Sequence, residues 1–219
     1  MMKKILDLDI KKTFFYIFSI YFLFGMHISL DHIGGYGLYL PFNIIGWIFV
    51  SFLIGMGFYQ INRSETLFIT QLQIYCLIGF ALLLIPFCYP NNFHANLALM
   101  RIMGLLGGLL LYFSFSQFQF SKEENNRFLY VILGSVLIQI LLKYSFFVQP
   151  QFSAMAQNNI FATFLSTGAG ISLFLLLHDD HSINNTLKRI LIFCIPLFIS
   201  FQIYYLQSRT GYLSLLVGS

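Results

Sequence analysis

Seven long apolar runs, separated by short polar breaks, constrain this chain more than any other feature. Each run is close to the roughly 20 residues that an α-helix needs to cross a hydrocarbon core. They lie near residues 13–30, 42–59, 66–88, 103–120, 128–148, 160–177 and 190–206. With 58% hydrophobic and 9% charged residues, the composition excludes an ordinary soluble domain. We therefore expect an all-α fold, a polytopic transmembrane helical bundle with seven complete spans.

An eighth apolar run begins at Tyr212 and reaches only Ser219, which is too short to cross a membrane. We interpret it as a truncated eighth span and the chain as the N-terminal part of a longer protein. No repeat, low-complexity tract or linker divides the sequence, so residues 1–219 are predicted to form a single transmembrane domain.

Basic residues gather in alternate breaks between the runs, which predicts an orientation because lysine and arginine are retained on the cytoplasmic side. The N-terminus is then cytoplasmic and the chain is multi-pass. The residues assigned to the cytoplasmic side are Lys3, Lys4, Lys11, Lys12, Arg63, Lys122, Arg127, Lys188 and Arg189. Since these cations act as topology signals, the net charge of +4 does not indicate a nucleic-acid partner.

Glycines predict two places of close helix approach. Gly104 and Gly108 form a small-xxx-small pair in the fourth run. Gly168 and Gly170 lack side chains and so allow another helix to approach the sixth run closely.

No metal site or cofactor is predicted. The three cysteines, Cys76, Cys88 and Cys194, lack the spacing of metal ligands. The run from His178 to His181 is interpreted as a solvated turn on the inner side, because no second cluster of ligands supports it.

Three basic residues, Arg101, Lys143 and Arg209, fall on the outer side against the charge bias. Arg209 lies beside Ser208 between the seventh and eighth runs, where a guanidinium can hold a phosphate through two parallel hydrogen bonds. Lys143 and Arg101 would widen a basic patch there. The alternative for each is an interfacial anchor whose charged end reaches the membrane surface.

Three carboxamides, Gln157, Asn158 and Asn159, precede the sixth run on the same outer side. A helix beginning there presents unpaired backbone N–H groups and a partial positive charge, which suit an anion. Simple capping of the helix by Asn158 or Asn159 is the alternative.

These two segments resemble the bacterial O-antigen ligase superfamily, and within it the O-oligosaccharyltransferases that glycosylate pilins. The resemblance is confined to residues 149–218, a motif-bearing region on the outer face. In the first segment the matching residues are Gln157, Asn159, Phe161, Ala162 and Leu165. In the second they are Ser208, Arg209, Thr210, Gly211, Tyr212 and Leu213. Ile160 departs from the pattern, because many relatives carry a histidine or another polar residue there.

The resemblance implies an enzyme of the bacterial inner membrane that uses a glycan linked to undecaprenyl pyrophosphate. The glycan would pass to a pilin protein, lipid A core or growing glycan at the periplasmic face. Arg209 would bind the pyrophosphate, and Gln157 with Asn159 would orient the donor. The rest of the expected substrate-binding set is Asn158, Ser208, Lys143 and Arg101.

The catalytic residue that the resemblance implies, a histidine base on a large periplasmic loop, would lie beyond Ser219, so none is assigned here. We therefore expect residues 1–219 to be inactive alone. Two alternatives from other classes stay open, namely a transporter or flippase of lipid-linked oligosaccharide and a non-catalytic membrane fragment.

Overall fold

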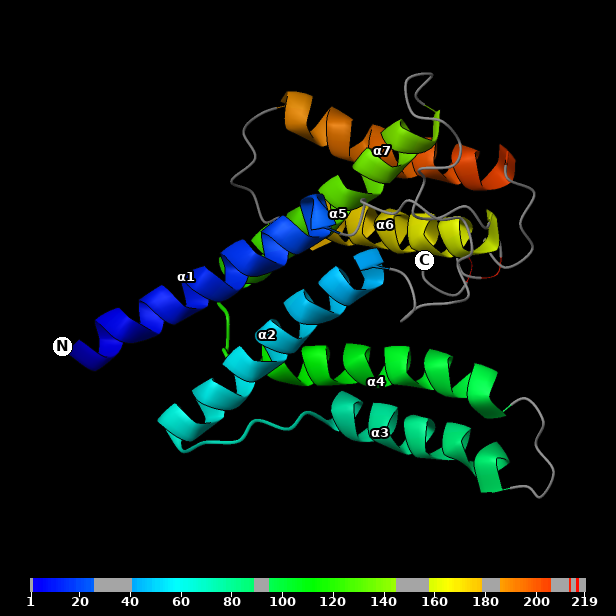
Figure 1. The fold of residues 1–219 in the computed structure, drawn as a ribbon. Coiled ribbons are helices and arrows are strands. Elements are labelled where there is room, and N and C mark those ends of the chain that lie inside the picture. The colour runs from blue at the N-terminus through cyan, green and yellow to red at the C-terminus, as the bar shows by residue number, and fades with distance from the viewer. Residues whose placement is uncertain are drawn as a thin grey trace. The chain divides into compact units, whose positions relative to one another are not determined.

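The computed structural model of the chain describes residues 2–25, 41–88, 95–144, 158–178, 186–205, 213 and 216. In this part of the chain every regular element is a helix, and each predicted apolar run coincides with one (Figure 1). The helices are α1 Met2–Leu23, α2 Pro41–Ser64, α3 Gln71–Leu84, the 3-10 turn η3 Ile85–Cys88, α4 Ala95–Ser116, α5 Lys122–Tyr144, α6 Asn158–His178 and α7 Thr186–Tyr205. The predicted all-α class with seven α-helices is confirmed.

The chain divides into two compact units. Unit 1 comprises Met1–Tyr21 and Gly35–Ser121, and unit 2 comprises Phe22–Gly34 and Lys122–Ser219. That both belong to one bundle stays a prediction.

In unit 1, α4 packs against both α2 and α3. Gly57 of α2 permits the closest approach, because a Cβ added there would lie 2.6 Å from the Cα of Ser114 on α4. The Ser114 hydroxyl donates a hydrogen bond of 3.3 Å to the backbone oxygen of Ile54 across the same crossing. A small residue facing a small residue is the packing that lets two helix backbones meet.

The predicted packing role of Gly104 and Gly108 is wrong, since a Cβ at either position would meet nothing within 4 Å. Their neighbour Gly107 makes the contact instead and lies under the ring of Trp47 on α2. On a helix, residues one apart point in different directions, so spacing alone did not identify the glycine that faces α2.

Aromatic rings join α1 to the end of α4. Phe14 of α1 is fully buried. Its ring centroid lies 4.6 Å from that of Phe118 and 5.9 Å from that of Phe120, both just after α4. Beside these rings the Lys11 ammonium donates a hydrogen bond of 3.2 Å to the backbone oxygen of Gln119.

A capping box begins α3. The backbone N–H of Gln73 donates to the Thr70 hydroxyl over 3.2 Å, and the backbone N–H of Thr70 donates to the Gln73 side chain over 2.8 Å. This reciprocal pair satisfies backbone groups that the first helical turn leaves open. The helix therefore begins at Gln71, although the apolar run begins at residue 66.

The polarity of α3 is the reverse of that in a soluble protein. Its one buried residue is Gln73, whose side-chain N–H donates a hydrogen bond of 2.7 Å to the Ser116 hydroxyl. Large apolar residues cover its surface and leave Tyr75 and Leu77 each 66% exposed.

Within the described residues, Lys122–Leu142 of α5 is the one helical stretch both long enough and apolar enough to cross a membrane. Four shorter apolar stretches have 10–17 residues, namely Gln71–Phe87, Ile102–Ser116, Phe161–Leu175 and Phe193–Tyr204.

The crossing of α2 and α4 supplies a stability test. We expect Gly57→Ala to lower stability by about 1–3 kcal/mol, because the added methyl group must push against the backbone of Ser114. Gly55→Ala is the matched control on the same helix, since its Cβ meets nothing within 4 Å. The midpoint of thermal unfolding of the purified protein in detergent checks this; equal midpoints for the two variants would contradict the close crossing.

Candidate functional site

The predicted outer-face residues belong to two different units. Asn158 and Asn159 are the first two residues of α6, and Lys143 is the last but one of α5, all in unit 2. Arg101 lies on α4 in unit 1. The structure describes these four residues through their backbone. Gln157, Ser208 and Arg209 lie outside the described residues.

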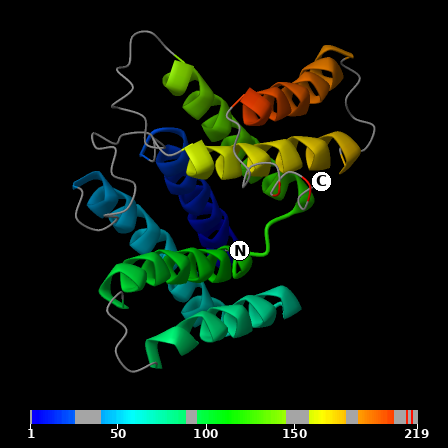
Figure 2. The same ribbon diagram turned by 90° about the vertical axis from the view of Figure 1, so that its right-hand side faces the viewer.

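An antiparallel hairpin of α6 and α7 places the two motif segments in unit 2. The helices pack along one another in opposite directions, so the beginning of α6 and the end of α7 lie at the same end of the hairpin (Figures 1 and 2). Gln157 directly precedes α6 in the sequence, and Arg209 follows Tyr205, the last residue of α7, by four positions. The start of α6 and the end of α7 therefore lie at one end of unit 2, whereas the second motif segment, apart from Leu213, lies outside the described residues.

A buried cluster fixes this end of the hairpin. Phe161 and Leu165 from the first turns of α6 pack with Ile199 and Ile203 from the last turns of α7, and all four are fully buried. Three of the residues quoted for the first motif segment, Phe161, Ala162 and Leu165, are thus fully buried.

The C-terminal half of α5 joins the same cluster. Val136 and Ile140 of α5 pack with the α6 and α7 residues just named. At the crossing a Cβ on Gly168 would lie 2.8 Å from a methyl group of Val136, so the predicted close approach at Gly168 is confirmed. Lys143 follows Ile140 by three positions, near the end of α5.

The start of α6 has the electrostatics of an anion site. The first four backbone N–H groups of an α-helix lack partners within the helix, and the aligned peptide dipoles place a partial positive charge there. The first residue of α6 is Asn158, so this partial charge lies beside the backbone of Asn158 and Asn159. A phosphate oxygen is the kind of acceptor that such a helix start accommodates.

The basic residues of α4 and α7 lie near one end of their helices. Lys188 and Arg189 are the third and fourth residues of α7, at the opposite end of the hairpin from the start of α6. On α4, Arg101 lies 15 positions before Ser116, which is about 22 Å along the helix axis. The orientation predicted from these cations stays a prediction.

Sequence reasoning did not single out the buried polar residues. In unit 2 the Ser166 hydroxyl donates to the Thr163 backbone oxygen over 2.7 Å, and that of Ser172 donates to the Ala169 oxygen over 2.8 Å. Because each bond closes onto its own helix, these hydroxyls serve the core. In unit 1, Gln73 and Gln117 are buried; the only signal in the sequence was an amide within or beside an apolar run.

A metal centre has no support in the described segments, where no three His, Cys, Asp or Glu side chains gather. His178 ends α6, and the rest of the run to His181 lies outside them.

No family model, no curated protein and no solved structure matches the chain.

The cluster at the candidate end supplies a test. We expect Phe161→Ala to cost about 3 kcal/mol of stability, because it removes a fully buried ring between α6 and α7. Phe201→Ala is the matched control on α7, where the ring is 62% exposed. Thermal unfolding in detergent measures both; a Phe161→Ala variant as stable as Phe201→Ala would contradict the packing that positions the start of α6.

Proposed function

We propose that this chain is the membrane part of an enzyme that transfers a glycan from a polyprenyl pyrophosphate to an acceptor at the outer face of a bacterial inner membrane. The observation that carries the proposal is the antiparallel α6–α7 hairpin, which places the start of α6 and the end of α7 at one end of unit 2. In the sequence, the two motif segments adjoin these two helix ends. The proposal needs a membrane, a site for a diphosphate and a place for the acceptor.

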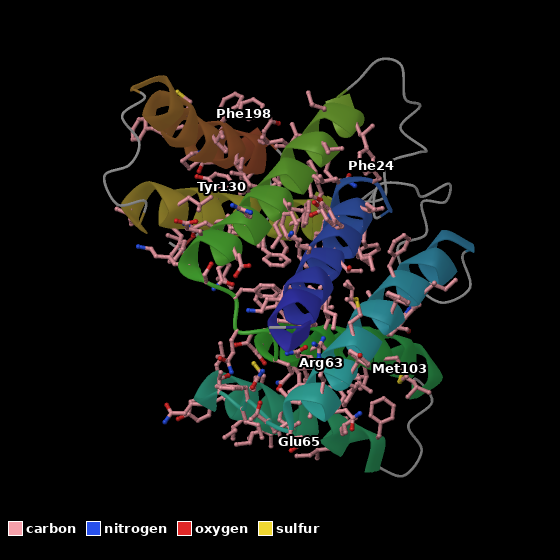
Figure 3. All side chains as sticks on the ribbon, turned by 90° about the vertical axis from the view of Figure 1, so that its left-hand side faces the viewer. Phe24, Arg63, Glu65, Met103, Tyr130 and Phe198 are labelled. Atoms are coloured by element: carbon pink, nitrogen blue, oxygen red, sulfur yellow. The ribbon has the colours of Figure 1, made fainter. Side chains whose placement is uncertain are left out.

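The apolar surface supports the membrane part of the proposal. In water, exposing large apolar side chains along whole helices is unfavourable by about 25 cal/mol for each Å². Here α3 exposes large apolar side chains while it buries Gln73. In unit 2, the side chain of Phe198 on α7 is 46% exposed (Figure 3). Hydrocarbon is the solvent in which such a surface is stable, and it favours helices because their backbone groups bond internally.

The ordering of charge supports the orientation. Lys11, Arg63 and the end of α4 lie toward one end of unit 1, whereas Arg101 lies toward the other end of α4. Cytoplasmic retention of basic residues accounts for this arrangement if the N-terminus is inside. The start of α6 and the end of α7 then face outward, where a lipid-linked donor would present its diphosphate.

The chemistry required at the outer end is stabilisation of a leaving group. An acceptor hydroxyl forms a new bond to the anomeric carbon of the glycan, the bond from that carbon to the diphosphate oxygen breaks, and the acceptor proton passes to a base. Negative charge grows on the diphosphate as the bond breaks, and preorganised donors lower that barrier. We assign this role to Arg209 and the start of α6, with Gln157 and Asn159 orienting the donor.

The remaining members of the proposed set have supporting roles. Asn158 would cap α6 or contact the donor, and Ser208 would add a hydroxyl beside Arg209. Lys143 and Arg101 would raise the positive potential at the outer face and attract the diphosphate.

The test is glycan transfer in cells that carry the gene, with the variants at matched membrane levels. We expect Arg209→Ala to lower the glycosylated product by about 100-fold and to leave lipid-linked donor unused, because a preorganised cation is lost where charge develops. The amount of glycosylated product from Arg209→Lys should lie between those of the wild type and Arg209→Ala, since lysine keeps the charge but loses the bidentate geometry. Arg127→Ala, an exposed arginine assigned to the inner side, is the control. Unchanged product from Arg209→Ala would refute the proposed donor site.

A further inference from the structure

The segment between α2 and α3 has an unusual surface. Three consecutive large apolar residues, Leu67, Phe68 and Ile69, are 56%, 43% and 57% exposed in a non-helical stretch. Side chains of an extended chain alternate between its two sides, so both sides of this segment are apolar. A contiguous exposed patch of this kind marks a surface that meets something other than water.

Hydrogen bonds from neighbouring residues satisfy part of the backbone of this segment, at Glu65, Phe68 and Thr70. The side chain of Gln117 accepts from the Phe68 backbone N–H over 3.0 Å and donates to the Phe68 carbonyl over 2.8 Å. The Gln73 side chain accepts from the Thr70 N–H, and the Glu65 N–H donates to the Ile61 carbonyl over 2.9 Å. These bonds lower the number of water molecules that the Phe68 and Thr70 backbone groups need, which favours entry into an apolar medium.

Basic residues flank the segment. Arg63 lies in the last turn of α2, two residues before Glu65, and Figure 3 labels both residues. Lys11 bonds to Gln119, two residues from the Gln117 that holds Phe68. Glu65 is the one acidic residue of the segment, so the local charge is positive by one through Lys11 and Arg63, and one guanidinium nitrogen of Arg63 is buried. This sign favours the anionic headgroups above the acyl chains of a membrane surface.

We propose that residues 65–70 insert into a phospholipid bilayer at the boundary between headgroups and acyl chains and anchor unit 1 there. Lipid fits better than a protein partner, because the apolar residues face both sides of the chain and continue into the exposed surface of α3. A single protein surface would cover only one side. This inference rests on the membrane part of the proposed function and is independent of the glycan chemistry.

Tryptophan fluorescence tests the insertion. Trp47, the only tryptophan of the chain, is first replaced by phenylalanine, and Phe68→Trp or Leu67→Trp is introduced separately. The full chain is placed in vesicles of phosphatidylcholine and phosphatidylglycerol whose acyl chains carry bromine near the glycerol end. Tyr75→Trp on the exposed surface of α3 is the control for lipid, and Glu123→Trp in the first turn of α5 is the control for water.

We expect bromine to quench roughly half of the fluorescence of Phe68→Trp and Leu67→Trp, as close contact at the headgroup–acyl boundary requires. If bromine quenches Tyr75→Trp but leaves Phe68→Trp and Leu67→Trp as bright as Glu123→Trp, the proposed insertion is wrong. The membrane assignment is then retained. If Tyr75→Trp is also as bright as Glu123→Trp, the membrane assignment fails together with the insertion.

Discussion

Backbone hydrogen bonding in an apolar chain is the constraint on which the rest of this structure depends. A chain whose side chains offer so little polarity satisfies its peptide groups most completely as α-helices. Where the helices stop, polar side chains take over the same task. Gln117 bonds both backbone groups of Phe68, and Gln73 with Thr70 closes the first turn of α3. Among the buried polar residues, Gln73, Ser114, Gln117, Ser166 and Ser172 each bond a backbone group.

In the membrane setting that we propose, close packing would replace the hydrophobic effect as the force that holds the helices together, because acyl chains are as apolar as the side chains. Small residues therefore lie where the helices cross. Gly57 meets Ser114 at the crossing of α2 and α4, and Gly168 meets Val136 at the crossing of α5 and α6. At each place dispersion contacts accumulate because two backbones approach closely.

The candidate site follows from the direction of the helices. Because α7 runs antiparallel to α6, the start of α6 and the end of α7 lie at one end of unit 2. Phe161 and Ile203 pack inside that end, and the aligned peptide dipoles of α6 give its start a partial positive charge. A diphosphate suits this end on charge, and the proposed roles of Arg209 and Gln157 follow from the sequence beside it.

The sequence by itself determined the helical class and the approximate place of all seven helices, because apolar runs near 20 residues have one stable local structure. It also identified Gly168 as a crossing point. Tertiary structure decided which glycine of the fourth run packs, since Gly107 faces Trp47 while Gly104 and Gly108 face open space. It decided that α3 begins at Gln71, because Thr70 and Gln73 form a capping box and Gln73 is held by Ser116. The physical reason is that periodicity specifies a helix, whereas the face it presents depends on a partner helix far away in the sequence.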